Sequence, residues 1–335
     1  MFRNEVDHLC PSSPTRVIRP RHEGRPSNSL CALDYCEDLF QSGNIAGGMS
    51  ELTDFLFHAR CALQTAGWKE LVQMTRQHPV TKLIHRCPIL HRAFHKPRGY
   101  PGDAELIDHV YGCGEAKMVE HPGTLSGQIY SYLAHAPVSR AVRYRRERLA
   151  QLIDEVRNPL AEKSAETAVV SIAAGHLREI ELTSSYQNGC KAGPILALDQ
   201  DPKSLAVIAR EYAELGVTSI KASVKDIIAR RVALAKNDLI YAAGLFDYVS
   251  TPVAQVLAKR MFDSLNPGGC LLLTNFLPNI RDCGFMEAVL DWWLIYRTEG
   301  DVQDLLVQIP AAQLNAARLY RDPDEQIVFL EVTRA

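Results

Sequence analysis

The hydrophobic positions of the chain follow two different patterns on either side of residue 158. Before it, apolar residues recur at helical spacing, as in 52–63 and 142–156, and this period predicts amphipathic helices. After it, short apolar runs bounded by turn residues alternate with helical stretches. Short strands separated by helices are typical of a parallel sheet with covered faces. We therefore expect an N-terminal helical region and a C-terminal α/β region.

Five apolar runs predict parallel strands, and two further runs predict a hairpin at the sheet edge. The hairpin strands are expected at 317–320 and 327–332, because the polar residues between them suit a tight turn. A helix is expected over 285–296. The parallel strands are expected at 168–173, 195–198, 217–221, 239–242 and 270–276. The predicted fold class is α/β, with a Rossmann-like sheet of five parallel strands plus a C-terminal antiparallel hairpin, and an N-terminal helical domain.

The beginning of the chain differs from both regions. Residues 11–28 are rich in Pro, Ser and Arg and have no apolar periodicity, a composition typical of disordered segments. Three units are therefore expected: a disordered Pro/Arg-rich tail at 1–30, a helical lid or substrate domain at 31–160, and a sheet-containing domain at 165–335. The arginines of the tail either stay solvated or touch an anionic surface.

Composition narrows the classes of function. The 39 acidic and 37 basic residues leave a formal net charge of -2, so no global field favours nucleic acid as a partner. The nine cysteines never form a CxxC spacing, which argues against a zinc ribbon or a disulfide framework and for a reducing compartment. No run of about 18 apolar residues predicts a membrane span, and residues 1–10 lack the apolar core of a secretory signal. A cytoplasmic protein without an integral membrane segment is expected.

The turn after the first predicted strand is a candidate ligand site, because ligands of open α/β sheets lie beyond the carboxyl ends of the strands. This turn contains Ala173, Ala174 and Gly175, small residues that let the backbone approach a ligand. Its single glycine does not satisfy GxGxxG, which weakens a pyrophosphate-binding interpretation. A plain strand-to-helix turn is the alternative.

Asp199 ends the second predicted strand, about twenty residues past that turn. A carboxylate there can accept hydrogen bonds from both hydroxyls of a ribose. Its alternative role, capping the next helix, is better filled by Asp201, which directly precedes a proline. Asp199 is therefore the expected ribose ligand, with Gln200 beside it.

The ends of the third and fourth predicted strands offer further contacts. Ser223 and Val224 can frame an adenine ring, or Asp226 can instead cap the helix that follows. Gly244 gives a flexible turn after the fourth strand. Two aromatic residues with an acid between them then follow at the expected cleft mouth, namely Phe246, Asp247 and Tyr248.

Several segments carry a resemblance to known proteins. LNPGG at 265–269 resembles the turn before the fifth strand of a class I methyltransferase domain that uses S-adenosylmethionine, and 165–335 resemble that domain as a whole. The segments HKPRGYPGD at 95–103, AG with RE at 174–179, GLFDY at 244–248 and WLIYR at 293–297 are more particular. In these the chain resembles, over roughly residues 80–335, a bacterial family of extracellular-factor, or 3-hydroxypalmitic acid methyl ester, biosynthesis proteins.

This resemblance implies S-adenosylmethionine as the cofactor and a small molecule as the methyl acceptor. The most concrete expectation is carboxyl O-methylation of a fatty or hydroxy acid. Methylation of N, O or C in a secondary metabolite is the alternative, and a non-catalytic cofactor-binding or scaffold module is an alternative of another class. A nucleic-acid methyltransferase is disfavoured, because no Asn/Asp-Pro-Pro-aromatic segment follows the fourth strand. A homodimer stays open.

The expected site residues follow from these motifs. Where many methyltransferases have an acid and three glycines at alternating positions, this chain has Ser171, Ala173, Gly175 and Leu177. Glu179 is then the expected carboxylate for the methionine amino group, or else a surface residue of a helix. The expected cofactor contacts are Ala173, Ala174, Gly175, Arg178, Glu179, Asp199, Gln200, Ser223, Val224, Gly244 and Phe246. The expected substrate contacts are Arg143, Asp247, Tyr248, Trp293 and Tyr296.

The loop at 96–103, rich in proline and glycine, is predicted to fold over the cofactor as a lid, with a structural elbow between helices as the alternative. Tyr100 and Asp103 are expected near the reacting methyl group, although Asp103 can also cap a helix at 104–111. With His176 and Asp247 they are the catalytic candidates for an acceptor that needs a base. A carboxylate acceptor needs none, since it is ionised near pH 7.

Three other groups allow two interpretations each. Arg143 either clamps a carboxylate or lies on a solvated basic helix. The aromatic and apolar residues Phe285, Met286, Trp292 and Trp293 line an acyl pocket or pack in the core. Cys87, His91 and His95 have helical ligand spacing, but the outer pair would be about 12 Å apart along a helix, so no metal is expected.

Overall fold

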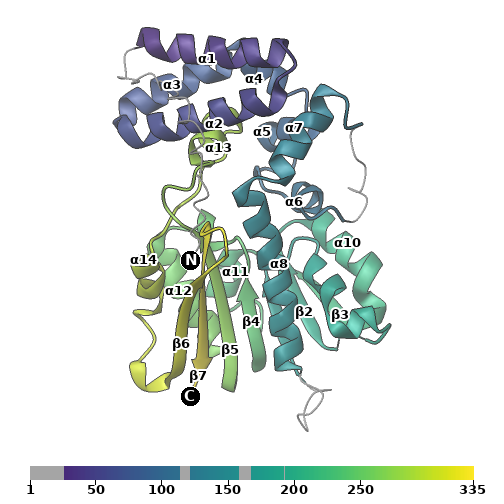
Figure 1. Cartoon of the computed structure of the whole chain (residues 1–335). Helices are drawn as coiled ribbons and strands as arrows, with labels where there is room; N and C mark the ends of the chain where they lie inside the picture. The colour runs from purple at the N-terminus through teal and green to yellow at the C-terminus, as the bar shows by residue number, and fades with distance from the viewer. Residues whose placement is uncertain (1–25, 114–120, 158–166, 192) are drawn as a thin grey trace, which may run out of the picture.

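The computed structural model describes residues 26–113, 121–157, 167–191 and 193–335. The strands are β1 (Val169–Ile172), β2 (Ile195–Asp199), β3 (Val217–Lys221), β4 (Asn237–Ala242), β5 (Leu265–Phe276), β6 (Leu314–Arg321) and β7 (Ile327–Arg334). They form one seven-stranded sheet in the order β3-β2-β1-β4-β5-β7-β6 (Figure 1). The first five strands are parallel, and β7 runs antiparallel between β5 and β6. The Rossmann-like sheet with a C-terminal hairpin that the sequence predicts is confirmed.

Strand β1 lies at the centre of the parallel part. Val169 pairs with Ile195 of β2 on one side and with Leu239 of β4 on the other, so the strand order reverses here. Every residue of β1 is buried, as expected for a strand that is covered on both faces. Open α/β sheets bind their ligands beyond the carboxyl ends of the strands at such a reversal.

The helices that precede the sheet form a layer at the top of Figure 1, and the last of them runs down from this layer along the sheet. They are α1 (Pro26–Gln41), α2 (Ile45–Ala62), α3 (Thr65–Gln77), α4 (Pro79–Ile84), α5 (Pro88–His95), α6 (Ala104–Tyr111), α7 (Leu125–Ala134) and α8 (Pro137–Val156). Helix α6 has the predicted bounds, and Asp103 caps it by accepting a hydrogen bond from Leu106 N at 2.9 Å.

The helices between and after the strands are α9 (Ser184–Gln187), α10 (Pro202–Tyr212), α11 (Val224–Ile228), α12 (Thr251–Asp263), α13 (Cys283–Val289) and α14 (Glu299–Gln303). Short 3-10 turns stand at Arg178–Leu182, Ala213–Leu215, Phe246–Tyr248, Asp304–Leu306 and Ala311–Gln313. Asp201 caps α10, as the sequence predicts, because its side chain accepts a hydrogen bond from Lys203 N at 2.9 Å.

Two predicted boundaries need correction. Helix α1 begins at Pro26, so the last residues of the predicted tail are helical, while 1–25 lie outside the described residues. Proline is accepted in a first helical turn, and Leu33, Cys36 and Phe40 bury one face of this helix.

The predicted helix at 285–296 ends at Val289. The following residues run as an irregular segment, in which Arg297 N donates to Phe276 O at 3.1 Å.

Helix α13 belongs to the C-terminal half of the sequence but packs among the N-terminal helices (Figure 1). Phe285 and Val289 share a buried core with residues of α1 to α5, and a Cβ on Gly284 would lie 2.4 Å from Leu56 O. The expected domain boundary at residues 160–165 therefore separates two parts of the sequence, but one buried core contains residues from both parts. Within the described part of the chain, no helix is both long and apolar enough to cross a membrane.

Candidate functional site

One cavity of about 610 Å³ lies where the carboxyl ends of the parallel strands meet the N-terminal helices. This volume is in the range typical of small-molecule sites. Its walls come from the turns after β1 to β4 and from α5, α6, α8 and α13. Many of the predicted site residues line it: Tyr100, Ala173, Ala174, Gly175, His176, Arg178, Glu179, Asp199, Gln200, Ser223, Val224, Gly244, Asp247 and Tyr248.

The turn after β1 has an unusual backbone. Ala173, Gly175 and Leu177 all have positive φ, at 54°, 56° and 56°. These three residues alternate along the turn, and only Gly175 is of the type that positive φ favours. An L-residue with positive φ is strained by roughly 1–2 kcal/mol. The chain therefore keeps a costly backbone shape at Ala173, which faces the cavity.

Asp199 stands at the end of β2 and is 5% exposed. Its Oδ2 accepts a hydrogen bond from Gly175 N and its Oδ1 one from Asp201 N, both at 2.8 Å. Each oxygen retains a lone pair for another donor. Burial raises the pKa of Asp199, and the backbone N–H groups oppose this shift. The carboxylate is thus fixed in place at the edge of the cavity.

Residues of the loop at 96–103 line this part of the cavity, and the loop is attached on two sides. Arg98 donates to Asp201 Oδ2 at 3.0 Å and to Ser204 Oγ at 3.2 Å. On the other side Gly102 packs so closely on Trp292 that a Cβ would lie 2.5 Å from that ring. Burial and the nearby Asp199 raise the pKa of Tyr100 well above its usual range. Tyr100 is therefore a neutral hydrogen-bonding group close to Asp199.

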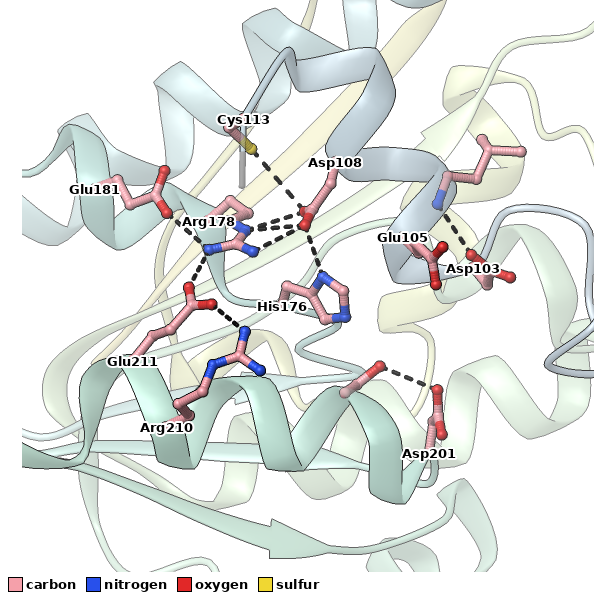
Figure 2. A network of polar contacts seen from close by, with 12 residues as sticks. Asp103, Glu105, Asp108, Cys113, His176, Arg178, Glu181, Asp201, Arg210 and Glu211 are labelled. Atoms are coloured by element: carbon pink, nitrogen blue, oxygen red, sulfur yellow. Dashed lines mark hydrogen bonds and ion pairs between the residues drawn. The ribbon is translucent and has the colours of Figure 1, made fainter. Parts of the chain in front are cut away.

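A buried polar network joins α6 to the turn after β1 (Figure 2). Asp108 Oδ2 contacts His176 Nδ1 at 2.8 Å and accepts a hydrogen bond from Arg178 Nη2 at 2.8 Å. Arg178 also contacts Glu181 and Glu211. Burial alone would raise the pKa of Asp108, but His176 and Arg178 hold it below its usual range. His176 Nε2 lies 3.4 Å from Arg98 Nη1, so both ring nitrogens of His176 have polar neighbours.

Glu179 is a buried carboxyl in the cavity wall. Tyr241 donates a hydrogen bond to Glu179 Oε1 at 2.6 Å. Burial raises the pKa of Glu179, whereas Tyr241, Arg146 and Arg145 oppose the shift. A cationic group of a ligand would therefore find a carboxylate here that has no ion pair within 4 Å in the described residues.

Ser223 and Asp226 form a capping box at the start of α11: Asp226 N donates to Ser223 Oγ at 3.2 Å and Ser223 N to Asp226 Oδ2 at 3.0 Å. The capping role that the sequence left open for Asp226 is thus present. Ser223 and Val224 still line the cavity, and so they remain available to frame a flat ring.

Arg145 of α8 is a buried cation in the cavity wall, 6% exposed. Its Nε has no hydrogen-bond partner, and no ion pair is formed by this arginine within the described ranges. A Cβ on Gly244 would lie 3.1 Å from Arg145 Nη1, so glycine makes room for the guanidinium. Gly244 has a φ of 77°, which also favours glycine.

The remainder of the cavity is mostly apolar and extends toward α7 and α13. Val138, Val142, Phe285 and Met286 belong to its walls. Asp247 also borders this part; burial raises its pKa to about 6 although its Oδ1 accepts a hydrogen bond from Phe276 N at 2.7 Å. This end of the cavity is suited to an apolar molecule with few polar groups.

Five predicted site residues do not line the cavity. Asp103 is fully buried between the α6 N-terminus and Arg92. Arg143 donates to the backbone oxygens of Val110 and Ala134. The other three are Phe246, which is in the core, Trp293, which is exposed, and Tyr296, which is half-buried beside the core.

Three residues that line the cavity were not predicted from the sequence: Asp108, Arg145 and Asp282. A signal existed for Arg145, because it shares a helix face with Val142 and Leu149 at i, i+3 and i+7. That apolar face is the one that the fold buries. Asp282 follows no periodic pattern, and only tertiary packing places it.

The structure does not bring the ligand atoms of Cys87, His91 and His95 together. Among the described residues one other group, Asp34, Glu37 and His78, has three ligand atoms close to one another. Its His78 already contacts Asp34 and accepts a hydrogen bond from Val80 N. The contact of His78 with Asp34 explains why these three ligand atoms lie close together.

Comparison with known proteins gives structural but not sequence relatives. No protein-family model and no curated protein matches the chain. A crystal structure from Bordetella parapertussis, described as a possible exported protein, is similar with a TM-score of 0.56 at 15% identity, over 87% of this chain and 96% of that one. This likeness shows a shared fold, and the cytoplasmic location stays a prediction.

Two enzymes are similar at lower scores. A magnesium protoporphyrin IX methyltransferase from Synechocystis, with bound S-adenosylhomocysteine, has a TM-score of 0.43 at 13% identity, covering 68% of this chain and 92% of that one. An N-methyltransferase from Bradyrhizobium japonicum, in complex with S-adenosylhomocysteine, has a TM-score of 0.40 at 15% identity, covering 60% and 90%.

Proposed function

We propose that the protein transfers a methyl group from S-adenosylmethionine to the carboxylate of a fatty or hydroxy acid. One observation carries this proposal. A single cavity joins Asp199, at the carboxyl end of β2, to an apolar chamber with the buried cation Arg145 in its wall. The first part suits a nucleoside with a ribose, and the second suits an acid with an apolar body.

The residues present fit the cofactor. Asp199 has lone pairs free for ribose hydroxyls, and Ser223 and Val224 flank the neighbouring wall for an adenine. The positive-φ turn at Ala173 and Gly175 would let the backbone approach the cofactor. Glu179 would accept hydrogen bonds from the methionine ammonium group, which would compensate a carboxylate whose burial is otherwise costly.

S-adenosylmethionine supplies a methyl group on a positively charged sulfur. A carboxylate oxygen of the acceptor uses a lone pair to form the new O–C bond while the C–S bond breaks and its electron pair stays on sulfur. No proton is released, because a carboxylate is ionised near pH 7. The protein therefore has to orient the carboxylate and exclude water, and Arg145 and the apolar walls can do both.

The polar groups around the cavity support an acceptor of this kind. Tyr100 keeps its proton because of its raised pKa. Asp103 is occupied by the α6 cap and by Arg92, and His176 has a polar neighbour on each ring nitrogen. None of these three catalytic candidates offers a free base. A carboxylate acceptor does not require one.

A second candidate function follows from Asp247. With a pKa of about 6, this carboxyl group is close to the range in which a general base works best. It would serve N- or O-methylation of a metabolite whose hydroxyl or amine must lose a proton. The two functions differ in their products, since a methyl ester releases methanol in mild base and the alternative products do not.

The test is transfer of a labelled methyl group to fatty and hydroxy acids by the purified full-length protein. We expect base-labile label with the acids and none with Asp199→Ala at a cofactor concentration that saturates only the wild type. Base-stable label in a cell extract would favour the Asp247 function. Absence of any transfer, together with absence of cofactor binding, would contradict both.

Two arginines of α8 give a matched pair of variants. Arg145→Gln should raise the KM for the acid by at least about tenfold, the effect of losing a charge-assisted hydrogen bond, and leave the cofactor Kd nearly unchanged. Arg143→Gln removes the same charge outside the cavity and should alter stability without altering this KM. If Arg145→Gln raises the cofactor Kd instead, the guanidinium holds the methionine carboxylate and not that of the acceptor.

A further inference from the structure

We propose that Asp282 binds a hydrogen-bond donor of the methyl acceptor, a hydroxyl or an ammonium group, in the part of the cavity that lies away from the cofactor groups. The proposal deepens the proposed function and rests on it, because it concerns the acceptor of the same site. It makes the preferred acceptor an elongated acid that carries a second polar group along its apolar body.

Asp282 is a buried carboxyl with an unused oxygen. It directly precedes α13, is 4% exposed and lines the cavity. Its Oδ2 has no hydrogen-bond partner in the described part of the chain. The helix contact of this residue is made by its backbone, since Met286 N donates to Asp282 O at 2.9 Å. The side chain is therefore not needed as a helix cap.

The neighbouring cations are committed to other partners. Arg281 donates to Asp54 Oδ1 at 2.6 Å and also contacts Tyr132 and Ser50. Arg140 forms an ion pair with Asp324 at 2.6 Å. Within the described ranges no ion pair within 4 Å reaches Asp282. Burial and the charge of Asp54 raise the pKa of Asp282 to about 6, whereas Arg281, Arg140 and its own backbone N–H oppose the shift.

The position of Asp282 separates it from the cofactor groups. Ser139, Val142, Arg145 and Leu149 of α8 all line the cavity, a stretch of about 15 Å along a helix. Arg140, the α8 cation that acts on Asp282, is about 7.5 Å along the axis from Arg145. Apolar side chains of α8 and α13 line the same cavity, among them Val142 and Met286.

This arrangement favours one chemical class of acceptor. A buried carboxyl without a donor is unfavourable, and a ligand that supplies the donor removes that cost. A ligand with an alkyl group in the same place leaves the carboxyl without a donor. The site should therefore discriminate strongly between acids with and without a donor group. The carboxylate to be methylated lies at Arg145 and the donor at Asp282.

The first experiment compares decanoic, dodecanoic and hexadecanoic acids with their ω-hydroxy and ω-amino counterparts as methyl acceptors. For the best-fitting length, we expect wild type to prefer a donor-bearing acid by about tenfold or more in kcat/KM. Asp282→Leu should abolish or reverse this preference, and Asp282→Asn should weaken it. Asp34→Asn removes an exposed carboxyl of α1 and should keep the wild-type preference.

The second experiment measures thermal unfolding and does not depend on turnover. Without ligand, both Asp282 variants should unfold at a higher temperature than wild type above pH 7, because an unsatisfied buried charge has been removed. With 12-aminododecanoic acid, wild type should gain more stability than with dodecanoic acid, and the variants should not.

The outcomes separate the two proposals. If acids are methylated but wild type and Asp282→Leu show the same preference among chain ends, the role of Asp282 is wrong and the methyltransferase proposal stands. If no acid is methylated, the proposed acid substrate fails. The unfolding experiment then still tests Asp282. If 12-aminododecanoic acid stabilises wild type and Asp282→Leu equally, Asp282 does not bind the donor.

Discussion

The two ends of the cavity differ in how their charged groups are satisfied. At the end near the turn after β1, Asp108 and Asp199 already have protein partners within 3.2 Å. Elsewhere in the cavity wall, Arg145 Nε beside Gly244 and Asp282 Oδ2 at the start of α13 have none in the described part of the chain. The charged groups near the turn after β1 are therefore held in place by the protein itself. Among the described residues, Arg145 and Asp282 each keep one polar atom without a protein partner, which a ligand could satisfy.

This contrast explains where stability and specificity should be located. A complete buried network stabilises the fold only as long as every member is present. An unsatisfied buried group lowers stability but discriminates between ligands. Substitutions at the two ends should therefore act in opposite directions on the free energy of unfolding.

The largest expected effect is the loss of Asp108. Asp108→Ala leaves the buried Arg178 and His176 without their shared carboxylate, which should lower the free energy of unfolding by about 3 kcal/mol. Urea unfolding at neutral pH measures it. Asp226→Ala, which removes the capping box of α11, should lower the free energy of unfolding much less. Equal losses in both variants would show that the Asp108 network adds nothing beyond a cap.

The second prediction concerns pH. The folded state of wild type holds the Asp282 proton up to a pKa of about 6, whereas an unfolded aspartate loses it near 4. Its contribution to stability is therefore favourable below about pH 4 and is lost as the pH rises through 6. Asn cannot titrate, so Asp282→Asn should match wild type near pH 4 and exceed it by roughly 2 kcal/mol at pH 7. A pH-independent difference would contradict the raised pKa.

Asp199 should affect binding more than folding. Asp199→Ala is expected to raise the Kd for S-adenosylmethionine at least about tenfold, the effect of losing charge-assisted hydrogen bonds to a ligand. Isothermal titration calorimetry would measure it. Asp34→Asn is the control, because it removes an exposed carboxyl of α1. An unchanged Kd in Asp199→Ala would exclude this carboxylate as a cofactor ligand.

The smallest expected effect is on the loop at 96–103. Arg98→Ala removes the contacts of one loop side chain to Asp201 and Ser204, while the packing of Gly102 on Trp292 still holds the loop. We expect cofactor release to accelerate by a few-fold, as measured by stopped-flow displacement. Arg231→Ala removes an exposed ion pair of α11 and should leave the release rate unchanged.

The sheet could be predicted because its strands are short, apolar and separated by turns. Each of the five parallel runs corresponds to a strand, and β3 has the predicted bounds. The helix predicted at 285–296 failed beyond Val289 for a tertiary reason. Asp291 has a φ of 50°, and Ile295 N bonds to Asp247 O, so the segment follows the ends of β4 and β5 and not its own periodicity.

The candidate site was predictable where it depends on strand ends and not where it depends on helix faces. Asp199 and Gly175 follow from their places after β2 and β1. Choosing between Arg143 and Arg145 required knowledge of which face of α8 packs inward. The apolar neighbours Val142 and Leu149 of Arg145 indicate that face, and the contact of α8 with the rest of the fold shows that it is the buried one.

Helix α13 has a consequence for how the chain is made. The core of α1 to α5 includes Phe285, Ala288 and Val289, and Trp68 Nε1 donates to Glu287 Oε2 at 2.7 Å. At about 5–20 residues per second, a ribosome needs several seconds after completing α8 to deliver this segment. During that interval the first helices expose apolar surface, and the sheet can begin to form before the helical layer is finished. The earliest part of the chain to emerge is thus among the last to become complete.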